Sequence, residues 1–200
     1  MDIFGRNVPG STAILQQRTV AVAGCGGLGS NAAVLLARAG LGRLILIDHD
    51  VVEPSNLNRQ HFFLDDLGKL KVEALAAHLR RIQPAIALEL QPRRLASDTV
   101  AGLGAADLLL EAFDRAEAKR WLIEAWCASF PERWVIGASG VSGLGRTEQL
   151  RVLRAGRIIM CGDFASDMAE GLCSARVAMV AAMQANLAVE CLVGDHDHRQ

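Results

Sequence analysis

The glycine-rich segment Gly24-Cys25-Gly26-Gly27-Leu28-Gly29 constrains the fold of this chain more than any other feature of the sequence. A short β-branched apolar run at 19–23 stops at the first glycine, and a helical pattern over 31–39 follows the last one. The apolar run at 43–48 predicts a second strand with Asp48 at its carboxyl end. Strand, glycine turn, helix and strand in this order predict a β-α-β unit with parallel strands and a right-handed crossover.

The rest of the chain continues this alternation of strands and helices. The remaining patterns predict helices over 72–82 and 117–128, strands at 86–90, 107–111 and 134–138, a hairpin of 149–153 with 157–161, and a final helix over 172–193. We therefore expect an α/β, Rossmann-like three-layer fold with a mostly parallel sheet and a C-terminal antiparallel hairpin followed by a helix. No repeat or linker divides the sequence, which predicts a single domain over 1–200.

Charge and hydropathy exclude two classes of partner. The chain has 21 Lys and Arg against 22 Asp and Glu, so its net charge of -1 gives no general attraction to nucleic acid or to an anionic membrane. The final apolar segment is interrupted by Arg176, Gln184, Asn186 and Glu190. These polar residues favour a buried helix over a membrane span.

The five cysteines stand at wide spacings and form no C-x-x-C pair, so we expect neither a disulfide framework nor a structural zinc site. The first ten residues carry charge and lack the apolar stretch of a secretory signal. Together these features predict a cytoplasmic protein.

The glycine segment predicts a nucleotide site. Its glycines allow backbone N–H groups to approach a phosphate, and the following helix N-terminus favours negative charge there. Ser30 can add a hydroxyl at the start of the helix. Asp48 follows the first glycine by 24 positions, near the spacing expected of an acid that binds a ribose hydroxyl. NAD, FAD and ATP all contain adenosine, so these residues leave the nucleotide open. The predicted nucleotide-binding residues of this segment are Gly24, Gly26, Gly27, Gly29, Ser30 and Asp48.

The next polar segment carries a family resemblance. The glycine loop, Asp48-x-Asp50 and Ser55-Asn56-Leu57-Asn58-Arg59-Gln60 resemble the ThiF/MoeB branch of ubiquitin-activating-enzyme-like adenylyltransferases. Lys71 and Asp114 match the lysine and the aspartate that this family carries farther along the chain. The resemblance covers almost the whole chain and is closest to the compact members that activate the sulfur carrier ThiS.

This resemblance implies a reaction and a set of partners. It implies ATP and Mg²⁺ as cofactors, and adenylation of the C-terminal glycine carboxylate of a ubiquitin-like, Gly-Gly-ending sulfur carrier, with release of pyrophosphate, in thiamine (thiazole) biosynthesis. Two features depart from the family pattern: the C-x-x-C pairs that hold zinc in many relatives are missing, and the usual Thr-Asp-Asn reads Phe113-Asp114-Arg115.

Adenylation concentrates negative charge, and the matched residues suit that charge. Arg59 offers a planar fork for phosphate oxygens and Lys71 a compact charge, while Asp114 can hold Mg²⁺ against the phosphates. Asp50 and Asn56 fall in the family's nucleotide-binding segment. By resemblance, Arg6 reaches the ATP phosphates of the other protomer, which implies a homodimer.

Two cysteines are candidate nucleophiles, because some relatives use a thiol to take the activated carrier. Cys161 stands at a predicted strand end and Cys173 precedes the final helix near Arg176. Two other functions remain open at this level. An NAD-dependent oxidoreductase shares the glycines and the acid, and a non-catalytic nucleotide-binding scaffold needs only the fold. The sequence also leaves open whether the carrier serves thiamine, molybdopterin, cysteine or tRNA modification.

Overall fold

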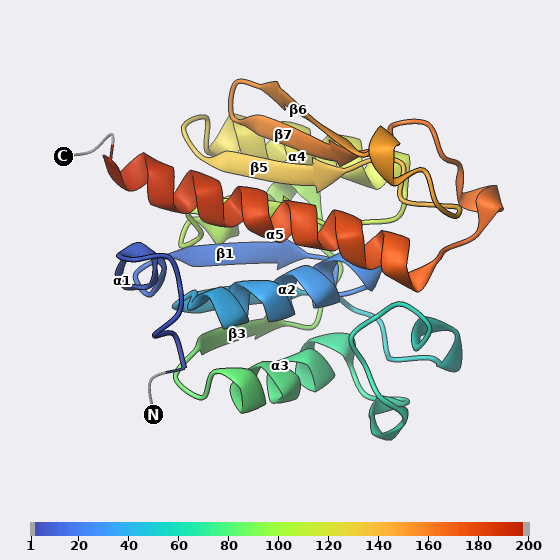
Figure 1. Cartoon of the computed structure of the whole chain (residues 1–200), viewed down its shortest axis with the longest axis horizontal. Helices are drawn as coiled ribbons and strands as arrows, with labels where there is room; N and C mark the ends of the chain where they lie inside the picture. The colour runs from blue at the N-terminus through green and yellow to red at the C-terminus, as the bar shows by residue number, and fades with distance from the viewer. Residues whose placement is uncertain (1–2, 198–200) are drawn as a thin grey trace.

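The computed structural model describes residues 3–197, whose strands form one seven-stranded sheet (Figure 1). The strand order is β3-β2-β1-β4-β5-β7-β6. The strands are β1 (Thr19–Ala23), β2 (Arg43–Ile47), β3 (Ala87–Gln91), β4 (Leu108–Glu111), β5 (Trp134–Ala138), β6 (Arg151–Ala155) and β7 (Ile158–Gly162). Every neighbouring pair is parallel except β6 with β7. The predicted Rossmann-like fold with a C-terminal antiparallel hairpin is confirmed.

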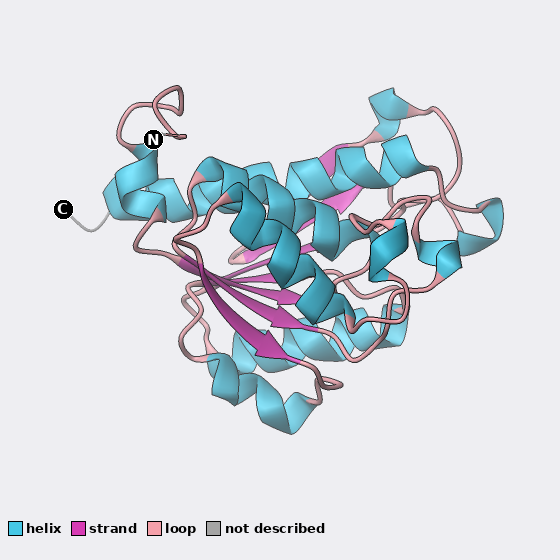
Figure 2. Ribbon diagram, turned by 90° about the horizontal axis from the view of Figure 1, so that it is seen from below, coloured by secondary structure: helices cyan, strands magenta, loops and turns pink. Residues whose placement is uncertain are grey.

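Helices cover both faces of the twisted sheet (Figure 2). They are α1 (Ser11–Leu15), α2 (Gly27–Ala39), α3 (Lys71–Ile82), α4 (Ala116–Ser129) and α5 (Ser174–Asp197). The strands bury alternate side chains in two separate cores, as a period of two requires. In β1, Val20 and Val22 join the core beneath α2, α3 and α5, whereas Ala21 and Ala23 join the core beneath α4.

The boundaries differ from the sequence prediction at three places. Helix α2 begins at Gly27, four residues before the predicted start, because the glycines themselves form its first turn. Helix α1 was not predicted, since five residues are too few to show a helical period. The hairpin lies slightly later in the chain than expected, with β6 at Arg151–Ala155 and β7 at Ile158–Gly162.

The polar residues of α5 are explained by its position across the sheet. Gln184 is fully buried, and its Nε2 donates to the backbone oxygens of Glu111 (2.9 Å) and Ile136 (3.4 Å). By length and composition alone the stretch Ser174–Gly194 could cross a membrane, and half of it is buried inside the fold. Its packing is that of a core helix whose few polar groups pair with strand carbonyls.

Candidate functional site

A cavity of about 830 Å³ opens at the carboxyl ends of the strands. Strands β1 and β4 are neighbours in the sheet, while α2 and α4, which follow them, pack on opposite faces. This is the topological switch point at which open α/β sheets bind ligands. Seven predicted nucleotide and phosphate residues line the cavity together with Asp114: Gly24, Gly26, Gly27, Asp48, Asp50, Arg59 and Lys71.

The glycine loop is held against the neighbouring strand by contacts that exclude side chains. Gly24 has a φ of +96°, and a Cβ there would lie 2.8 Å from the backbone oxygen of Ala112. A Cβ on Gly29 would lie 1.8 Å from the backbone oxygen of Gly24. Only glycine fits these two positions, so the backbone of the loop can approach a ligand closely.

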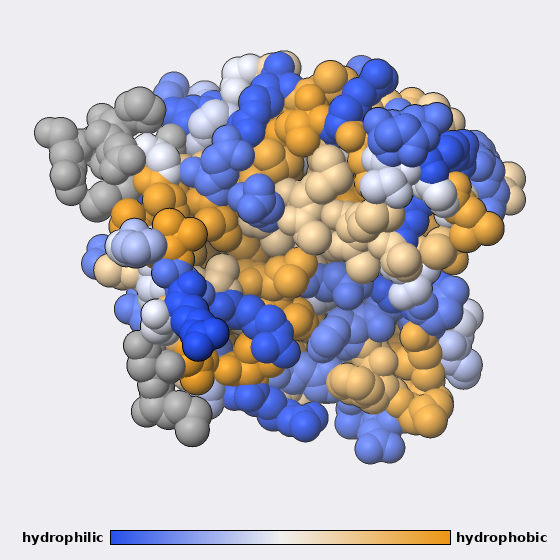
Figure 3. All heavy atoms as spheres, viewed as in Figure 1, coloured by the Kyte–Doolittle hydropathy of each residue, from blue (hydrophilic) through white to orange (hydrophobic). Residues whose placement is uncertain are grey.

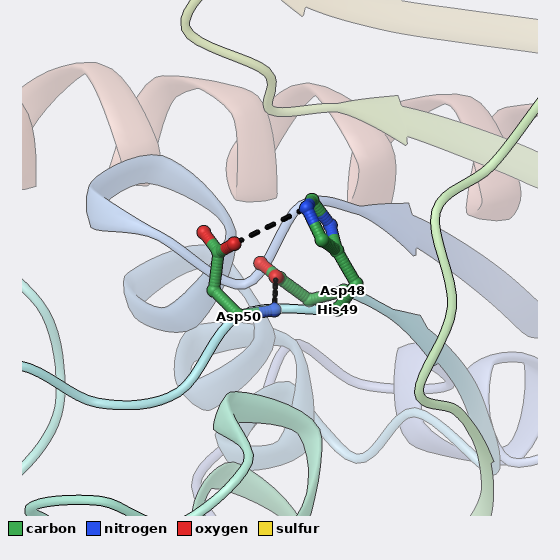
Figure 4. Close-up of side chains that lie close together, drawn as sticks. All are labelled: Asp48, His49 and Asp50. Carbon is green, nitrogen blue, oxygen red and sulfur yellow. Dashed lines mark hydrogen bonds and ion pairs between the residues drawn. The ribbon is translucent and has the colours of Figure 1, made fainter.

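Asp48 joins the end of β2 to this loop. Its carboxylate accepts hydrogen bonds from the backbone N–H groups of Cys25 (2.7 Å) and Asp50 (2.8 Å; Figure 4). A carboxylate has about four acceptor positions, so lone pairs remain for a ligand hydroxyl. The position at the cavity wall is the one that a ribose-binding acid requires.

Lys71 and Asp50 form an ion pair at the cavity. Lys71 Nζ lies 2.9 Å from Asp50 Oδ2, and the lysine side chain is only 8% exposed. Burial alone would raise the pKa of Asp50, but the hydrogen bond and charge of Lys71 lower it below the usual range of a carboxyl. Asp50 therefore holds the Lys71 ammonium at the first turn of α3, where it faces the cavity.

Arg59 and Asp114 approach the cavity from separate segments. The Arg59 guanidinium donates to the backbone oxygen of Ser55 (2.9 Å) and to Asn58 Oδ1 (2.8 Å), so its own loop orients it. Asp114 is exposed at the end of β4 and makes no hydrogen bond or ion pair with any residue of the described range. A free carboxylate beside a phosphate-binding loop suits Mg²⁺, which takes one or two protein carboxylates together with phosphate oxygens and water.

A second cluster of possible metal ligands lies after β2. Ligand atoms of Asp48, His49 and Asp50 lie within 4.8 Å of one another, and this is the one such group of three in the described part of the chain (Figure 4). His49 Nε2 is 3.3 Å from Asp50 Oδ1, and Arg94 is 3.0 Å from the same nitrogen. Because Lys71 and backbone N–H groups already engage these carboxylates, Asp114 fits the cation better.

A buried ion pair at the end of β4 was missed by the sequence analysis. Lys119 Nζ lies 3.1 Å from both carboxylate oxygens of Glu111, whose side chain is fully buried. Burial raises the pKa of Glu111, and the neighbouring Lys119 opposes that rise. Lys119 also lines the cavity. The one available signal was an acid at the end of an apolar strand, eight positions before a lysine.

The opposite wall of the cavity comes from the loops after β5 and β7, and it was also missed. Asp163 and Arg176 form a fully buried ion pair, and Arg176 also donates to the backbone oxygen of Gly145. Although burial opposes ionisation, hydrogen bonds from Ser166 and Ala165 and the contact with Arg176 lower the pKa of Asp163 to about 2. This network fixes the segment 166–168, which lines the cavity.

Three predicted nucleotide-binding residues lie behind the cavity wall. Gly29 packs beneath the loop, as described above. Ser30 is fully buried, donates to the backbone oxygen of Gly26 (2.6 Å) and accepts from the backbone N–H of His61 (2.9 Å). Asn56 is also buried and accepts from the backbone N–H of Glu53 (3.0 Å). None of the three lines the cavity, and Ser30 and Asn56 shape the loops instead of offering a hydroxyl or amide to the ligand.

The candidate thiols and Arg6 also lie apart from the cavity. Cys161 is fully buried, and burial raises the pKa of its thiol to about 12, which does not suit a nucleophile. Cys173 is half-buried and does not line the cavity. Arg6 is exposed beside Asn7, which donates to the backbone oxygen of Ala39 (2.9 Å) at the end of α2. That end of the sheet, beside α1, is opposite the loops before α3 (Figure 1).

The loop between β2 and α3 also presents apolar side chains to solvent. Phe63, Leu64 and Leu67 are exposed in it, and apolar surface is visible where these loops project (Figure 3). His78 and Asp66 anchor the loop from below, with 2.9 Å between Nε2 and Oδ2.

Comparison with known proteins places this arrangement among ATP-using enzymes. A sequence model of the ThiF family matches residues 6–200. The chain is 37% identical over 140 residues to "Ubiquitin-like modifier-activating enzyme 5" of Bombyx mori, covering 64% of this chain and 35% of the relative. For the Drosophila persimilis enzyme of the same name the identity is 36% over 155 residues, covering 71% and 40%. The chain thus spans well under half the length of these relatives.

Solved structures share the fold at lower sequence identity. E. coli tRNA N6-threonylcarbamoyladenosine dehydratase, TcdA, in complex with ATP, superposes with a TM-score of 0.85 at 21% identity and covers 96% of this chain and 92% of that chain. E. coli MccB with ATP gives a TM-score of 0.74 at 21% identity, covering 91% and 57%. At these identities the structures establish the common fold.

Proposed function

This chain belongs to the ThiF family, and from that premise we propose that it is an ATP-dependent adenylyltransferase acting as one domain over 1–200. The substrate is the C-terminal glycine carboxylate of a ubiquitin-like sulfur carrier ending in Gly-Gly. The carrier is ThiS-like, and the product serves thiamine biosynthesis. The length and the N-terminal motif of the sequence support that carrier over the alternatives, and the cavity itself supports the adenylation.

One observation carries this proposal. A single cavity brings together a glycine loop, an acid placed for ribose and three charged side chains from separate segments: Arg59, Lys71 and Asp114. An oxidoreductase that transfers hydride to NAD has no need of these three charges beside the glycine loop. TcdA and MccB, which share the fold, have been solved with ATP, which supports ATP as the nucleotide here.

The residues account for the reaction as follows. A carboxylate oxygen of the carrier attacks the α-phosphorus, the bond between that phosphorus and the β-phosphate oxygen breaks, and pyrophosphate leaves with the negative charge. Backbone N–H groups of the glycine loop and the N-terminus of α2 hold the phosphates. Arg59 and Lys71 offset the charge that develops on the leaving group. No general base is needed, because the nucleophile is already an anion.

Asp114 would hold Mg²⁺, which when bound neutralises phosphate charge beside the leaving group. Asp48 orients the nucleotide through its ribose, and Asp50 keeps the Lys71 ammonium at the first turn of α3. Each of these roles belongs to a residue that lines the cavity.

We also propose that two copies of the chain complete each site. Arg6 lies near the end of α2 that is farthest from its own cavity, so it can serve a phosphate only across an interface between copies. The family resemblance of the N-terminal segment supports this arrangement. Analytical ultracentrifugation tests it, since a monomer at the concentration of full activity contradicts it.

The decisive experiment is ATP/pyrophosphate exchange measured with a panel of Gly-Gly-ending carriers, including a ThiS-like, a molybdopterin-type and a cysteine-biosynthesis carrier. We expect exchange that depends on the carrier and is fastest with the ThiS-like protein. ATP binding without exchange on any carrier indicates a scaffold. Reduction of NAD without exchange indicates an oxidoreductase, and exchange driven by a different carrier replaces only the pathway.

A further inference from the structure

The side chain of Gln60 is buried at the cavity without a hydrogen-bond partner. It lines the cavity and is 9% exposed. Its Oε1 is fully shielded and unpaired, and its Nε2 also makes no hydrogen bond with a described residue. That nitrogen lies 3.7 Å from the position that a Cβ on Gly26 would occupy, so the amide stands directly over the glycine loop.

The backbone of Gln60 is fixed, in contrast to its side-chain amide. The Gln60 N–H donates to the backbone oxygen of Asn56 (3.0 Å), and the Phe62 N–H donates to the backbone oxygen of Gln60 (2.8 Å). Rotating the side chain toward a ligand therefore breaks no hydrogen bond. A buried polar group left unpaired is unfavourable, so a ligand that pairs with this amide gains what the free protein lacks.

Two other glutamines show that this state is particular to Gln60. Gln83 and Gln184 also have a shielded, unpaired Oε1. Their amide nitrogens are paired, however, since Gln83 donates to the backbone oxygen of Leu41 (3.1 Å) and Gln184 to that of Glu111 (2.9 Å). Neither side chain lines the cavity. Among these three, Gln60 alone has both ends of its amide free and faces the site.

The chemistry of the amide selects the ligand group. Phosphate and carboxylate oxygens can accept from Nε2 but cannot donate to Oε1. A peptide unit offers both an N–H and a C=O, which match the two ends of a glutamine amide. We propose that Gln60 is a positioning residue that binds the last peptide unit before the reacting carboxylate. This inference rests on the proposed function and refines it, because it makes the site selective for a peptide-borne carboxylate.

The test compares two probes that differ by that peptide unit. AMP contains the nucleotide alone, whereas a glycylglycyl sulfamoyl adenosine adds the two terminal glycines through a stable mimic of the acyl phosphate. Calorimetry with the wild-type chain is expected to show tighter binding of the conjugate than of AMP. Gln60→Ala is expected to weaken the conjugate about tenfold, the loss typical of a hydrogen-bonded pair, and to change AMP binding less than about twofold.

Gln83→Ala is the matched control, because it removes a buried glutamine with a similar unpaired oxygen far from the cavity. It is expected to lower the melting temperature while leaving the ratio of the two affinities unchanged. If Gln60→Ala keeps the wild-type ratio, or loses AMP and the conjugate equally, Gln60 only supports the loop and the inference is overturned. If the wild-type chain itself shows no preference for the conjugate, both the inference and the proposed peptide substrate are overturned.

Discussion

The two walls of the cavity are held in different ways. The wall made by 24–29 and 48–71 is built from two nearby stretches of chain, and neighbours in these stretches satisfy most of its polar groups. The wall made by 139–146 and 163–168 depends on Asp163 and Arg176, which bring β7 and α5 together in the core. This second wall also contains Arg146 and Phe164, the non-glycine residues of the described chain with positive φ.

The difference separates two tasks. The first wall carries the features that any nucleotide requires, and these features are short and local. The second wall lies across the cavity, where the group that attacks the nucleotide must enter, and it is built from strained loops around a buried ion pair. We infer that the first wall tolerates change in the core, whereas the second depends on it.

The largest expected effect is on the stability of the second wall. Arg176→Met leaves the Asp163 carboxylate buried without its partner, and breaking such a pair costs about 3 to 5 kcal/mol. Urea unfolding should show that loss in the free energy of unfolding. Arg154→Ala is the control, since Arg154 pairs with Glu190 (2.7 Å) on the surface, where pairs contribute about 0 to 1 kcal/mol.

The double variant Asp163→Asn with Arg176→Met sharpens this result. It removes both charges, so it should be more stable than the sum of the two single losses predicts. A loss for Arg176→Met no larger than that for Arg154→Ala would show that both walls are held by weak local contacts, and the comparison would fail.

The contrast between the walls also explains what could be predicted from the sequence. The β1-α2-β2 unit, Asp48, Arg59 and Lys71 were predictable because strand pattern, glycines and charges lie within some fifty consecutive positions. The pairs Glu111–Lys119 and Asp163–Arg176 were not, because an ion pair between separate elements leaves no local pattern. Asn56 and Ser30 were placed in the right loops but in the wrong role, since their burial is decided by three-dimensional packing.

The next largest effect concerns catalysis in the first wall. Alanine at Arg59, Lys71 or Asp114 should lower pyrophosphate exchange about a hundredfold to a thousandfold, because groups that act on developing charge matter most in the transition state. ATP affinity should fall much less. Arg59→Lys should restore activity only in part, because the planar fork is lost.

Lys69→Ala provides the control for that series. Lys69 lies two positions before Lys71 but pairs with Asp66 (3.2 Å) and does not line the cavity. Its exchange rate should stay close to wild type, with circular dichroism reporting the fold of every variant. Near-normal exchange in two of the three cavity variants would rule out the adenylation mechanism.

A smaller effect is expected for the nucleotide itself. Asp48→Ala should weaken ATP binding by about 1 to 3 kcal/mol, because it removes the acceptor for a ribose hydroxyl and the support of the glycine loop at the backbone of Cys25. Calorimetry with ATP and with 2′-deoxy-ATP separates the two contributions. Equal losses for both nucleotides mean that Asp48 acts through the loop, and an unchanged affinity removes it from the site.

The smallest effect is the dependence of stability on pH, and it again distinguishes the walls. Asp163 has a pKa of about 2 in the folded chain, below the usual value of about 3.9 for an unfolded aspartate. The unfolded state therefore binds the proton more tightly, so the stability contributed by Asp163 is present above about pH 4 and is lost as the pH falls toward 2. Asp163→Asn should flatten the decline in unfolding free energy over that range.

Asp50→Asn supplies the comparison from the first wall. The pKa of Asp50 is also lowered, so its contribution to stability is lost in the same direction, as acid protonates the carboxylate. Its side chain is 52% exposed, however, and solvent screens its attraction to Lys71. Unfolding curves between pH 5 and about pH 2 should therefore flatten more for Asp163→Asn than for Asp50→Asn. Equal flattening would mean that the buried pair stabilises the second wall no more than the half-exposed pair stabilises the first.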